Sequence, residues 1–254
     1  MAYLIDGSSH RAGIKNEAQL REYLKNGAAK KLYPNLSDNL RVERRGGTTF
    51  KQDIEIIDGE TTILISAKKK NIVNKGSFDW VNSSAAVRDV ASLIKFASVV
   101  SEIRRDKPQY GLAKLRVMGA AYDSICNMTS DELAFLLDKH IKGKNKDMKI
   151  IITESNTGKN WEYSFSDSPL YHAIGSMTPE IVIGRGVDSA QVKFRDSNGN
   201  LFDYGLRIRV VTNNGISALI GTSDVNKSST PVVKFQQDNI AGLIDSLGNK
   251  IRMF

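Results

Sequence analysis

The chain has 254 residues, of which 41% are hydrophobic and 25% are charged, as in ordinary soluble globular proteins. Its formal net charge of +8 favours a polyanionic partner, with nucleic acid first, although a merely solubilising basic surface accounts for the charge equally well. The single cysteine, Cys126, excludes an internal disulfide, and three histidines do not favour a histidine-rich zinc site.

The N-terminal residues lack a basic region followed by a long apolar core, and no apolar run approaches membrane-spanning length. We therefore expect an intracellular, cytoplasmic protein with no membrane partner. Aromatic residues make up only 7% of the chain, which argues against a reader of single strands that works by base stacking.

Apolar residues at helical spacing predict a helix over residues 12–31, and residues 40–45 predict a strand. Residues 49–57 and 61–70 are β-branched, apolar-rich runs joined by Asp58-Gly59-Glu60, which predicts a β-hairpin. The polar stretch 71–84 is expected to be a loop.

Two long helices are expected next, the longest over residues 85–105 and another over 110–127, where Cys126 lies in an apolar context typical of a core. A further helix begins at Ser130 and ends at Gly143. After a basic linker, residues 149–153 predict a strand.

The remaining chain is rich in short strands separated by turn signals. We expect strands at 161–165, 180–184, 190–196, 204–212, 216–221 and 232–237, and a final helix over 239–248. The predicted division is an α/β part over residues 1–146 and a β-rich part over 147–254, which together give an α/β (α+β) fold.

Alternation along the hairpin places Asp53 and Glu55 on one face of the first strand, and Ser66 and Lys68 on one face of the second. Pairing of the two strands is therefore expected to bring Asp53 close to Ser66 and Lys68. Converging carboxylates bind magnesium, and a lysine stabilises developing negative charge, so this pattern points to phosphodiester hydrolysis.

An aspartate on one strand, a residue-x-lysine on the next strand and a glutamate on a preceding helix resemble the PD-(D/E)xK nuclease superfamily. Asp53 matches the first acid, Ser66-Ala67-Lys68 matches the acid-x-lysine tripeptide, and Glu17 matches the helical glutamate. The resemblance covers residues 12–100 and implies a restriction-endonuclease-like mixed sheet flanked by helices. It makes Asp53, Lys68, Ser66 and Glu17 the expected catalytic residues.

The resemblance further implies a DNA endonuclease dependent on Mg²⁺ or Mn²⁺, of bacterial or phage origin, the restriction type being one form. Residues 1–146 would be the nuclease core, and residues 147–254 would serve recognition or dimerisation, with a homodimer as one expected assembly. Four basic residues flank the site as expected phosphate contacts: Arg44, Arg45, Lys69 and Lys70.

The chain departs from the family where Ser66 replaces the second acid, because a serine hydroxyl is a poorer metal ligand than a carboxylate. Glu55 or Glu17 is expected to supply the missing charge beside Asp53, so the expected metal ligands are Asp53, Glu55 and Glu17. If neither does, the chain is a catalytically inactive nucleic-acid-binding protein.

Other interpretations stay open. Asp53 and Glu55 are also compatible with an ordinary solvated strand face, and the lysines with a charged edge strand. In the β-rich part, five side chains are suited either to reading base edges or to a plain polar face: Arg207, Arg209, Lys234, Gln236 and Gln237. A bacterial or phage structural protein is the remaining alternative, supported only by the richness in strands.

Overall fold

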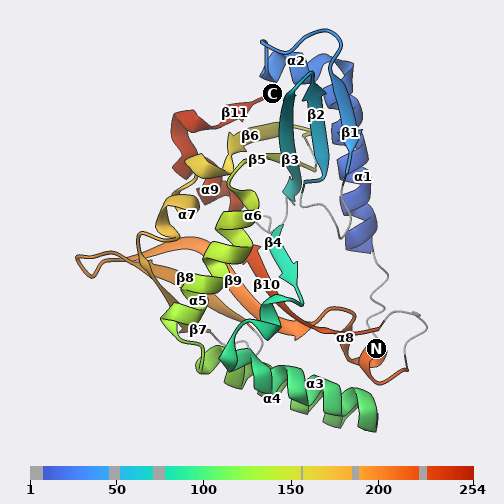
Figure 1. Cartoon of the computed structure of the whole chain (residues 1–254), viewed down its shortest axis with the longest axis vertical. Coiled ribbons are helices and arrows are strands. Elements are labelled where there is room, and N and C mark those ends of the chain that lie inside the picture. Colours follow the sequence, from blue (N-terminus) through green and yellow to red (C-terminus); the bar gives the residue numbers. More distant parts are fainter. Residues whose placement is uncertain (1–7, 46–51, 71–77, 156, 185–188, 223–227) are drawn as a thin grey trace. The chain divides into compact units, whose positions relative to one another are not determined.

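A computed structural model describes residues 8–45, 52–70, 78–155, 157–184, 189–222 and 228–254 (Figure 1). The chain forms two compact units, each assembled from separate segments. The first consists of Met1–Phe78, Lys144–Tyr171 and Asn239–Phe254, and the second of Asp79–Gly143 and His172–Asp238.

Within the described ranges, the first unit is built on a mixed sheet of order β1-β2-β3-β5-β6-β11. Strands β3 and β5 are parallel, with Leu64 opposite Met148, and the other neighbours are antiparallel. The strands are β1 (Arg41–Arg44), β2 (Ile54–Asp58), β3 (Thr61–Lys70), β5 (Met148–Glu154), β6 (Asn160–Ser164) and β11 (Arg252–Met253).

Helix α1 (Ser8–Tyr23) and the short α2 (Ala29–Leu32) cover one face of this sheet. A distorted turn separates them, where Gly27 adopts a φ of 105° that glycine tolerates best. Leu20 and Leu24 from the helical segment pack on Ile54, Ile56 and Ile65 from β2 and β3. This apolar layer fixes the register of the hairpin, because a slip by one residue would turn Ile54, Ile56 and Ile65 away from the helices.

The second unit contains an antiparallel sheet of order β4-β10-β9-β8-β7 in the described residues. Its strands are β4 (Phe78–Ser83), β7 (Thr178–Ile183), β8 (Ser189–Arg195), β9 (Leu201–Thr212) and β10 (Pro231–Gln237). Buried residues alternate with more exposed ones along β8, β9 and β10, as expected for a sheet with one covered face.

Three helices pack on the strands of this second sheet: α3 (Ile94–Asp106), α4 (Tyr110–Cys126) and α5 (Ser130–Leu137). Helix α5 begins with a capping box in which Thr129 and Glu132 satisfy each other's backbone N–H groups. The remaining helices are α6 (Gly143–Asn145), α7 (Pro169–Ala173), α8 (Gly215–Leu219) and α9 (Ile240–Leu247).

The predicted α+β class, with a mixed sheet flanked by helices, is confirmed. The predicted hairpin is also confirmed, although its first strand begins only at Ile54, and residues 46–51 lie outside the described ranges. The expected division at residue 146 differs from the observed units. Strand β5 lies parallel to β3, and a parallel pair needs a long crossover, which here carries residues 79–143 of the second unit.

Four local predictions were wrong. Part of the expected loop, Phe78–Ser83, is strand β4, and residues 216–221 lie mostly in helix α8 rather than in a strand. The helix expected from residue 85 begins at Ile94, because the extended Val90 separates a short turn at Ala86–Arg88 from the turn at Ala91–Leu93 that leads into α3. Cys126 is exposed, since it lies on the outer side of α4.

Candidate active site

Asp53 lies in a bend directly before β2, and the partner strand β3 extends beyond this bend. Its backbone is held on both sides: the N–H donates to the Ile65 carbonyl at 2.9 Å, and its own carbonyl accepts from the Arg45 N–H at 2.9 Å. The carboxylate Oδ2 accepts a hydrogen bond from the Ala67 N–H at 2.8 Å and from the Ser66 hydroxyl at 3.3 Å. The hairpin therefore brings Asp53 to Ser66, as predicted.

Ser66 is 1% exposed and lies between Asp53 and strand β5, where Ile150 is its register partner. Its hydroxyl donates to the Asp53 carboxylate. At the position where the nuclease motif described above has its second acid, this chain therefore has a serine, whose hydroxyl orients the neighbouring Asp53 carboxylate.

Glu17, on α1, is in the electrostatic field of the same hairpin. Burial and the nearby charge of Asp53 raise the pKa of Glu17, whereas a hydrogen bond from Arg44 and the charges of Arg44 and Lys68 oppose the increase. Arg44 Nη2 donates to Glu17 Oε2 at 3.2 Å. The charges of Asp53 and Lys68 thus both act on Glu17, although the three residues come from different parts of the chain.

Lys68 is half-buried on β3, and its Nζ lies 5.7 Å from the centroid of the Phe78 ring. The aromatic face restricts the lysine without neutralising it.

Glu55 is directed elsewhere. It is 8% exposed, and it accepts hydrogen bonds from Arg45 Nε at 2.8 Å and from Gln52 Nε2 at 2.5 Å. Burial would raise the pKa of Glu55, but these hydrogen bonds and the charge of Arg45 together lower it. The expected pairing of Glu55 with Asp53 is replaced by an ion pair with Arg45, which also contacts Glu43 at 3.2 Å.

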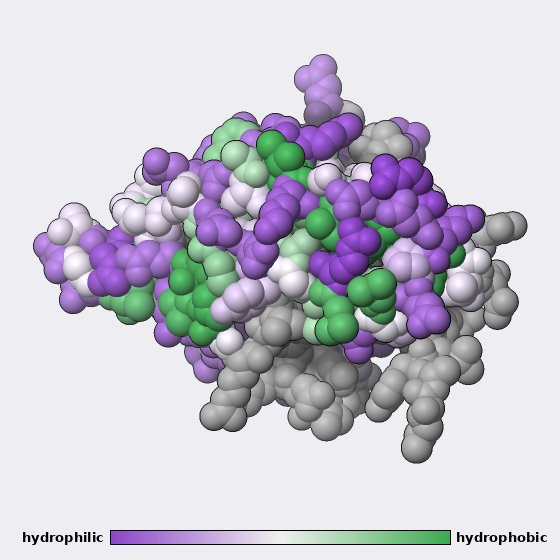
Figure 2. Space-filling model, turned by 90° about the horizontal axis from the view of Figure 1, so that it is seen from below, coloured by the Kyte–Doolittle hydropathy of each residue, from purple (hydrophilic) through white to green (hydrophobic). Residues whose placement is uncertain are grey.

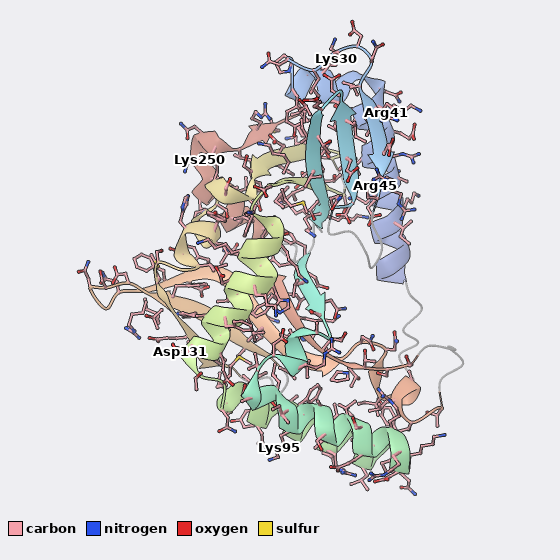
Figure 3. All side chains as sticks on the ribbon, viewed as in Figure 1. Lys30, Arg41, Arg45, Lys95, Asp131 and Lys250 are labelled. Atoms are coloured by element: carbon pink, nitrogen blue, oxygen red, sulfur yellow. The ribbon has the colours of Figure 1, made fainter. Side chains whose placement is uncertain are left out.

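The four expected phosphate contacts are placed differently from one another. Arg44 pairs with Glu17, and Arg45, labelled in Figure 3, pairs with Glu55. Lys70 Nζ lies 3.0 Å from a Glu154 oxygen and 5.2 Å from the centroid of the Trp161 ring. Lys69 is exposed, and no ion pair to it is found in the described part of the chain.

Lys69 instead lines a pocket of about 390 Å³, which the sequence analysis did not identify. Helix α1 contributes Asn16, Gln19, Leu20 and Tyr23 to the lining, and the β5–β6 hairpin contributes Thr153, Glu154, Ser155, Gly158 and Asn160. Three of the α1 residues, at positions 16, 19 and 23, follow helical spacing next to Glu17. That helical spacing is the sequence signal that could have indicated a shared pocket-lining face of α1.

Two carboxylates, Asp53 and Glu17, are the oxygen donors that this arrangement offers to a metal ion. Among the described residues, no cluster of three or more histidines, cysteines, aspartates or glutamates could hold a metal. Magnesium retains several waters and is often bound by only one or two carboxylates, so this donor set fits Mg²⁺ or Mn²⁺ better than a metal with an all-protein shell.

Comparisons with known proteins found no matching family model, no matching curated sequence and no matching solved structure. None of the helices in the described ranges combines the length and hydrophobicity that a membrane crossing requires.

Proposed function

We propose that the chain is a DNA endonuclease dependent on Mg²⁺ or Mn²⁺. The observation that carries this proposal is that Glu17 lies within electrostatic reach of both Asp53 and Lys68: burial and the charge of Asp53 raise the pKa of Glu17, and the charge of Lys68 opposes the increase. Ordinary surface charges spread apart in solvent. An acid held beside a second acid at a cost to its own ionisation, as Glu17 is, is instead typical of functional sites.

In this proposal Asp53 and Glu17 hold the metal, with waters completing its shell. When bound, the ion would activate a water and polarise the scissile phosphate. Ser66 and the Ala67 N–H orient Asp53 through its Oδ2. Lys68 stabilises the negative charge that develops on the phosphate, and the Phe78 ring restricts its side chain.

DNA is the proposed partner, and the net charge of +8 supports long-range attraction of a polyanion. Lys69 is the proposed phosphate contact, because it is exposed and lies one residue from Lys68. A cytoplasmic protein of bacterial or phage origin remains part of the proposal.

Supercoiled plasmid incubated with the purified protein tests the proposal, with Mg²⁺, Mn²⁺ or chelator. We expect nicking or linearisation that the chelator abolishes. Asp53→Asn should eliminate cleavage while remaining folded, because an asparagine oxygen can still accept from the Ala67 N–H. Calorimetry should show that Asp53→Asn also loses Mn²⁺ binding.

Lys68→Ala should lower the cleavage rate at saturating DNA by about 10²–10³-fold, as for removal of one electrostatic group from a catalytic site. Lys31→Ala, which removes an exposed lysine on α2, is the matched control and should cleave normally. A Lys68→Ala protein with normal turnover but weaker binding would assign Lys68 to DNA contact and remove it from catalysis.

A second candidate is an inactive DNA-binding protein. The observation in its favour is that a serine, Ser66, stands in place of the second acid, and that Glu55 is engaged in an ion pair with Arg45. Salt-sensitive DNA binding without cleavage in either metal, and without Mn²⁺ binding to the wild-type protein, would favour this candidate.

A further inference from the structure

Helix α4 presents an apolar stripe to solvent that its own unit does not cover. Leu112 is 54% exposed, Leu115 71% and Tyr122 41%, and Cys126 is exposed as well. With Gly119 these residues recur at alternating intervals of three and four, so they share one side of the helix. The opposite side packs inward through Ala113, Val117, Ala120, Ala121 and Ile125.

An α-helix that is apolar on two opposite sides is usually buried on both. Figure 2 views the protein from the side of α3 and α4, where apolar areas emerge between hydrophilic ones. Gly119 adds a second anomaly, because glycine in a helix interior is less favourable than alanine. Nothing lies within 4 Å of a Cβ built at Gly119, so packing within the chain does not require glycine there.

The stripe is arranged symmetrically about Gly119. Leu112 and Cys126 lie seven residues before and after it, and Leu115 and Tyr122 lie four before and three after. A two-fold interface needs such self-complementarity, because each copy uses the same surface. An antiparallel pair crossing at Gly119 would place Leu112 of one copy opposite Cys126 of the other.

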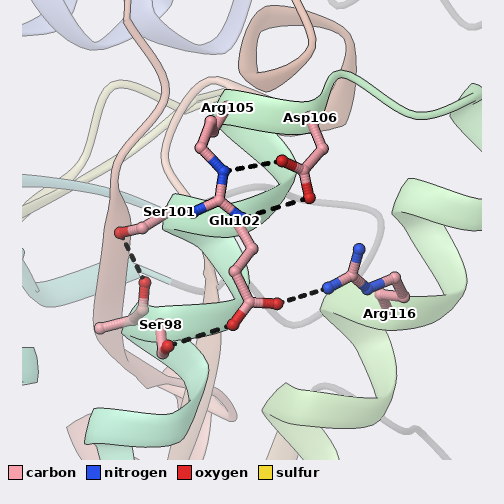
Figure 4. Close-up of polar contacts among 7 residues, drawn as sticks. Ser98, Ser101, Glu102, Arg105, Asp106 and Arg116 are labelled. Atoms are coloured by element: carbon pink, nitrogen blue, oxygen red, sulfur yellow. Dashed lines mark hydrogen bonds and ion pairs between the residues drawn. The ribbon is translucent and has the colours of Figure 1, made fainter.

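Charges beside the stripe select the antiparallel direction. Arg116 and Asp123 lie on the same flank, where α3 pairs with them through Glu102 at 2.6 Å and Lys95 at 2.9 Å. Figure 4 shows the Arg116–Glu102 contact and the polar α3 surface around it. In an antiparallel pair the flank meets itself in reverse order, so Arg116 approaches Asp123 of the second copy. In a parallel two-fold pair this flank would instead face the opposite flank of the second copy, so Arg116 and Asp123 would not meet.

We propose that α4 is a homodimerisation surface, on which a second copy of this chain docks antiparallel across Gly119. The proposal is independent of nuclease activity, and it places the dimer contact on α4 rather than in residues 147–254. A single helix pair buries less than the roughly 1,200–2,000 Å² of standard interfaces. The dimer should therefore dissociate on dilution.

Disulfide trapping of the full-length Leu112→Cys variant tests the arrangement. Under mild oxidation we expect a covalent dimer through Cys126 and the introduced cysteine of the other copy, seen on non-reducing gels and by peptide mapping. Wild-type protein should stay monomeric on the same gel, because its two Cys126 residues would lie about 20 Å apart along the paired helices. Leu112→Cys combined with Cys126→Ser should also fail to cross-link.

Lys114→Cys is the matched control, because it introduces an exposed cysteine on α4 outside the stripe. Equal cross-linking of this control and Leu112→Cys would overturn the proposal, as would a Cys126–Cys126 bond in the wild-type protein. Absence of any Leu112→Cys cross-link at concentrations where sedimentation detects a dimer would overturn it as well, because another surface would then form that dimer. A wild-type protein that sediments as a monomer up to about 100 µM, where a dimer with a micromolar Kd would already form, would also refute it.

Gly119→Glu gives a second readout that misfolding cannot imitate. Glutamate is a better helix former than glycine, so the monomer should be as stable as wild type or more stable. A charge at the crossing point should nevertheless weaken the dimer at least tenfold by sedimentation velocity. Unchanged dimerisation of Gly119→Glu would rule out α4 as the contact.

Discussion

At the scale of single residues, Glu17 carries the clearest signature of a site. Burial and the neighbouring Asp53 raise its pKa, so the folded protein keeps this proton to higher pH than the unfolded chain does. For an acid with a raised pKa, the folded state binds more protons than the unfolded state between the two pKa values. Stability contributed by protonated Glu17 is therefore lost as the pH rises through that window.

Glu17→Gln should consequently raise the free energy of unfolding at pH 7 in metal-free buffer. The difference from wild type should shrink as the pH falls below about 4, the ordinary range for a glutamate, because both side chains are then neutral. Urea unfolding between pH 3.5 and 8 measures this. A destabilised Glu17→Gln protein at pH 7 would instead mean that the ion pair with Arg44 outweighs the repulsion from Asp53.

Lys69 and Lys70 are adjacent in sequence but differ in their surroundings. Lys70 is paired with Glu154 and packed on Trp161, whereas Lys69 is exposed at the rim of the pocket. If DNA binds there, Lys69→Ala should reduce the slope of log affinity against log salt by about 0.9, the value for one phosphate contact. Lys70→Ala should change that slope little. Fluorescence anisotropy at several salt concentrations distinguishes the two, and equal effects would contradict this assignment.

At the scale of elements, the hairpin was predictable because two independent signals agree. Its alternating isoleucines define the buried face, and Asp58-Gly59-Glu60 defines the turn. The approach of Asp53 to Ser66 follows from that register. Alternation along the hairpin could not indicate that Glu55 pairs with Arg45, because Arg45 directly follows strand β1, outside the hairpin.

Short apolar runs were where sequence reasoning failed. Residues 216–221 contain isoleucines and leucine in a run too short to separate a strand from a buried turn of helix, and they lie mostly in α8. Strand β4 was missed because its apolar residues stand among polar ones, and pairing with the distant β10 stabilises it. Tertiary contacts decide such segments.

Gly59 gives a direct test of the hairpin. Its φ of 57° is left-handed, and no atom lies within 4 Å of a Cβ added there, so a substitution would add backbone strain without a clash. Gly59→Val should lower the free energy of unfolding by about 1–2 kcal/mol. Gly59→Asn is the matched control and should cost less, since asparagine tolerates this conformation. Equal loss for both variants in chemical unfolding would point to a cause other than backbone conformation.

At the scale of the whole molecule, the two units are interleaved along the chain. The first sheet receives β5 and β6 from residues after 147, while α3, α4 and α5 from residues before 146 pack in the second unit. A change in composition near residue 146 suggested a boundary. Composition alone could not show that the chain returns to its first sheet.

This interleaving predicts that neither half folds alone. A chain ending at Lys146 would leave β3 without β5, exposing the edge along which Leu64–Lys70 pairs with Met148–Glu154. Unpaired strand edges lose backbone hydrogen bonds and promote aggregation. We expect fragments 1–146 and 147–254 each to lack cooperative thermal unfolding by circular dichroism, and an equimolar mixture refolded together to recover it. A cooperatively folded 1–146 fragment would instead support a boundary at residue 146, and the parallel β3–β5 pair would then be dispensable for folding.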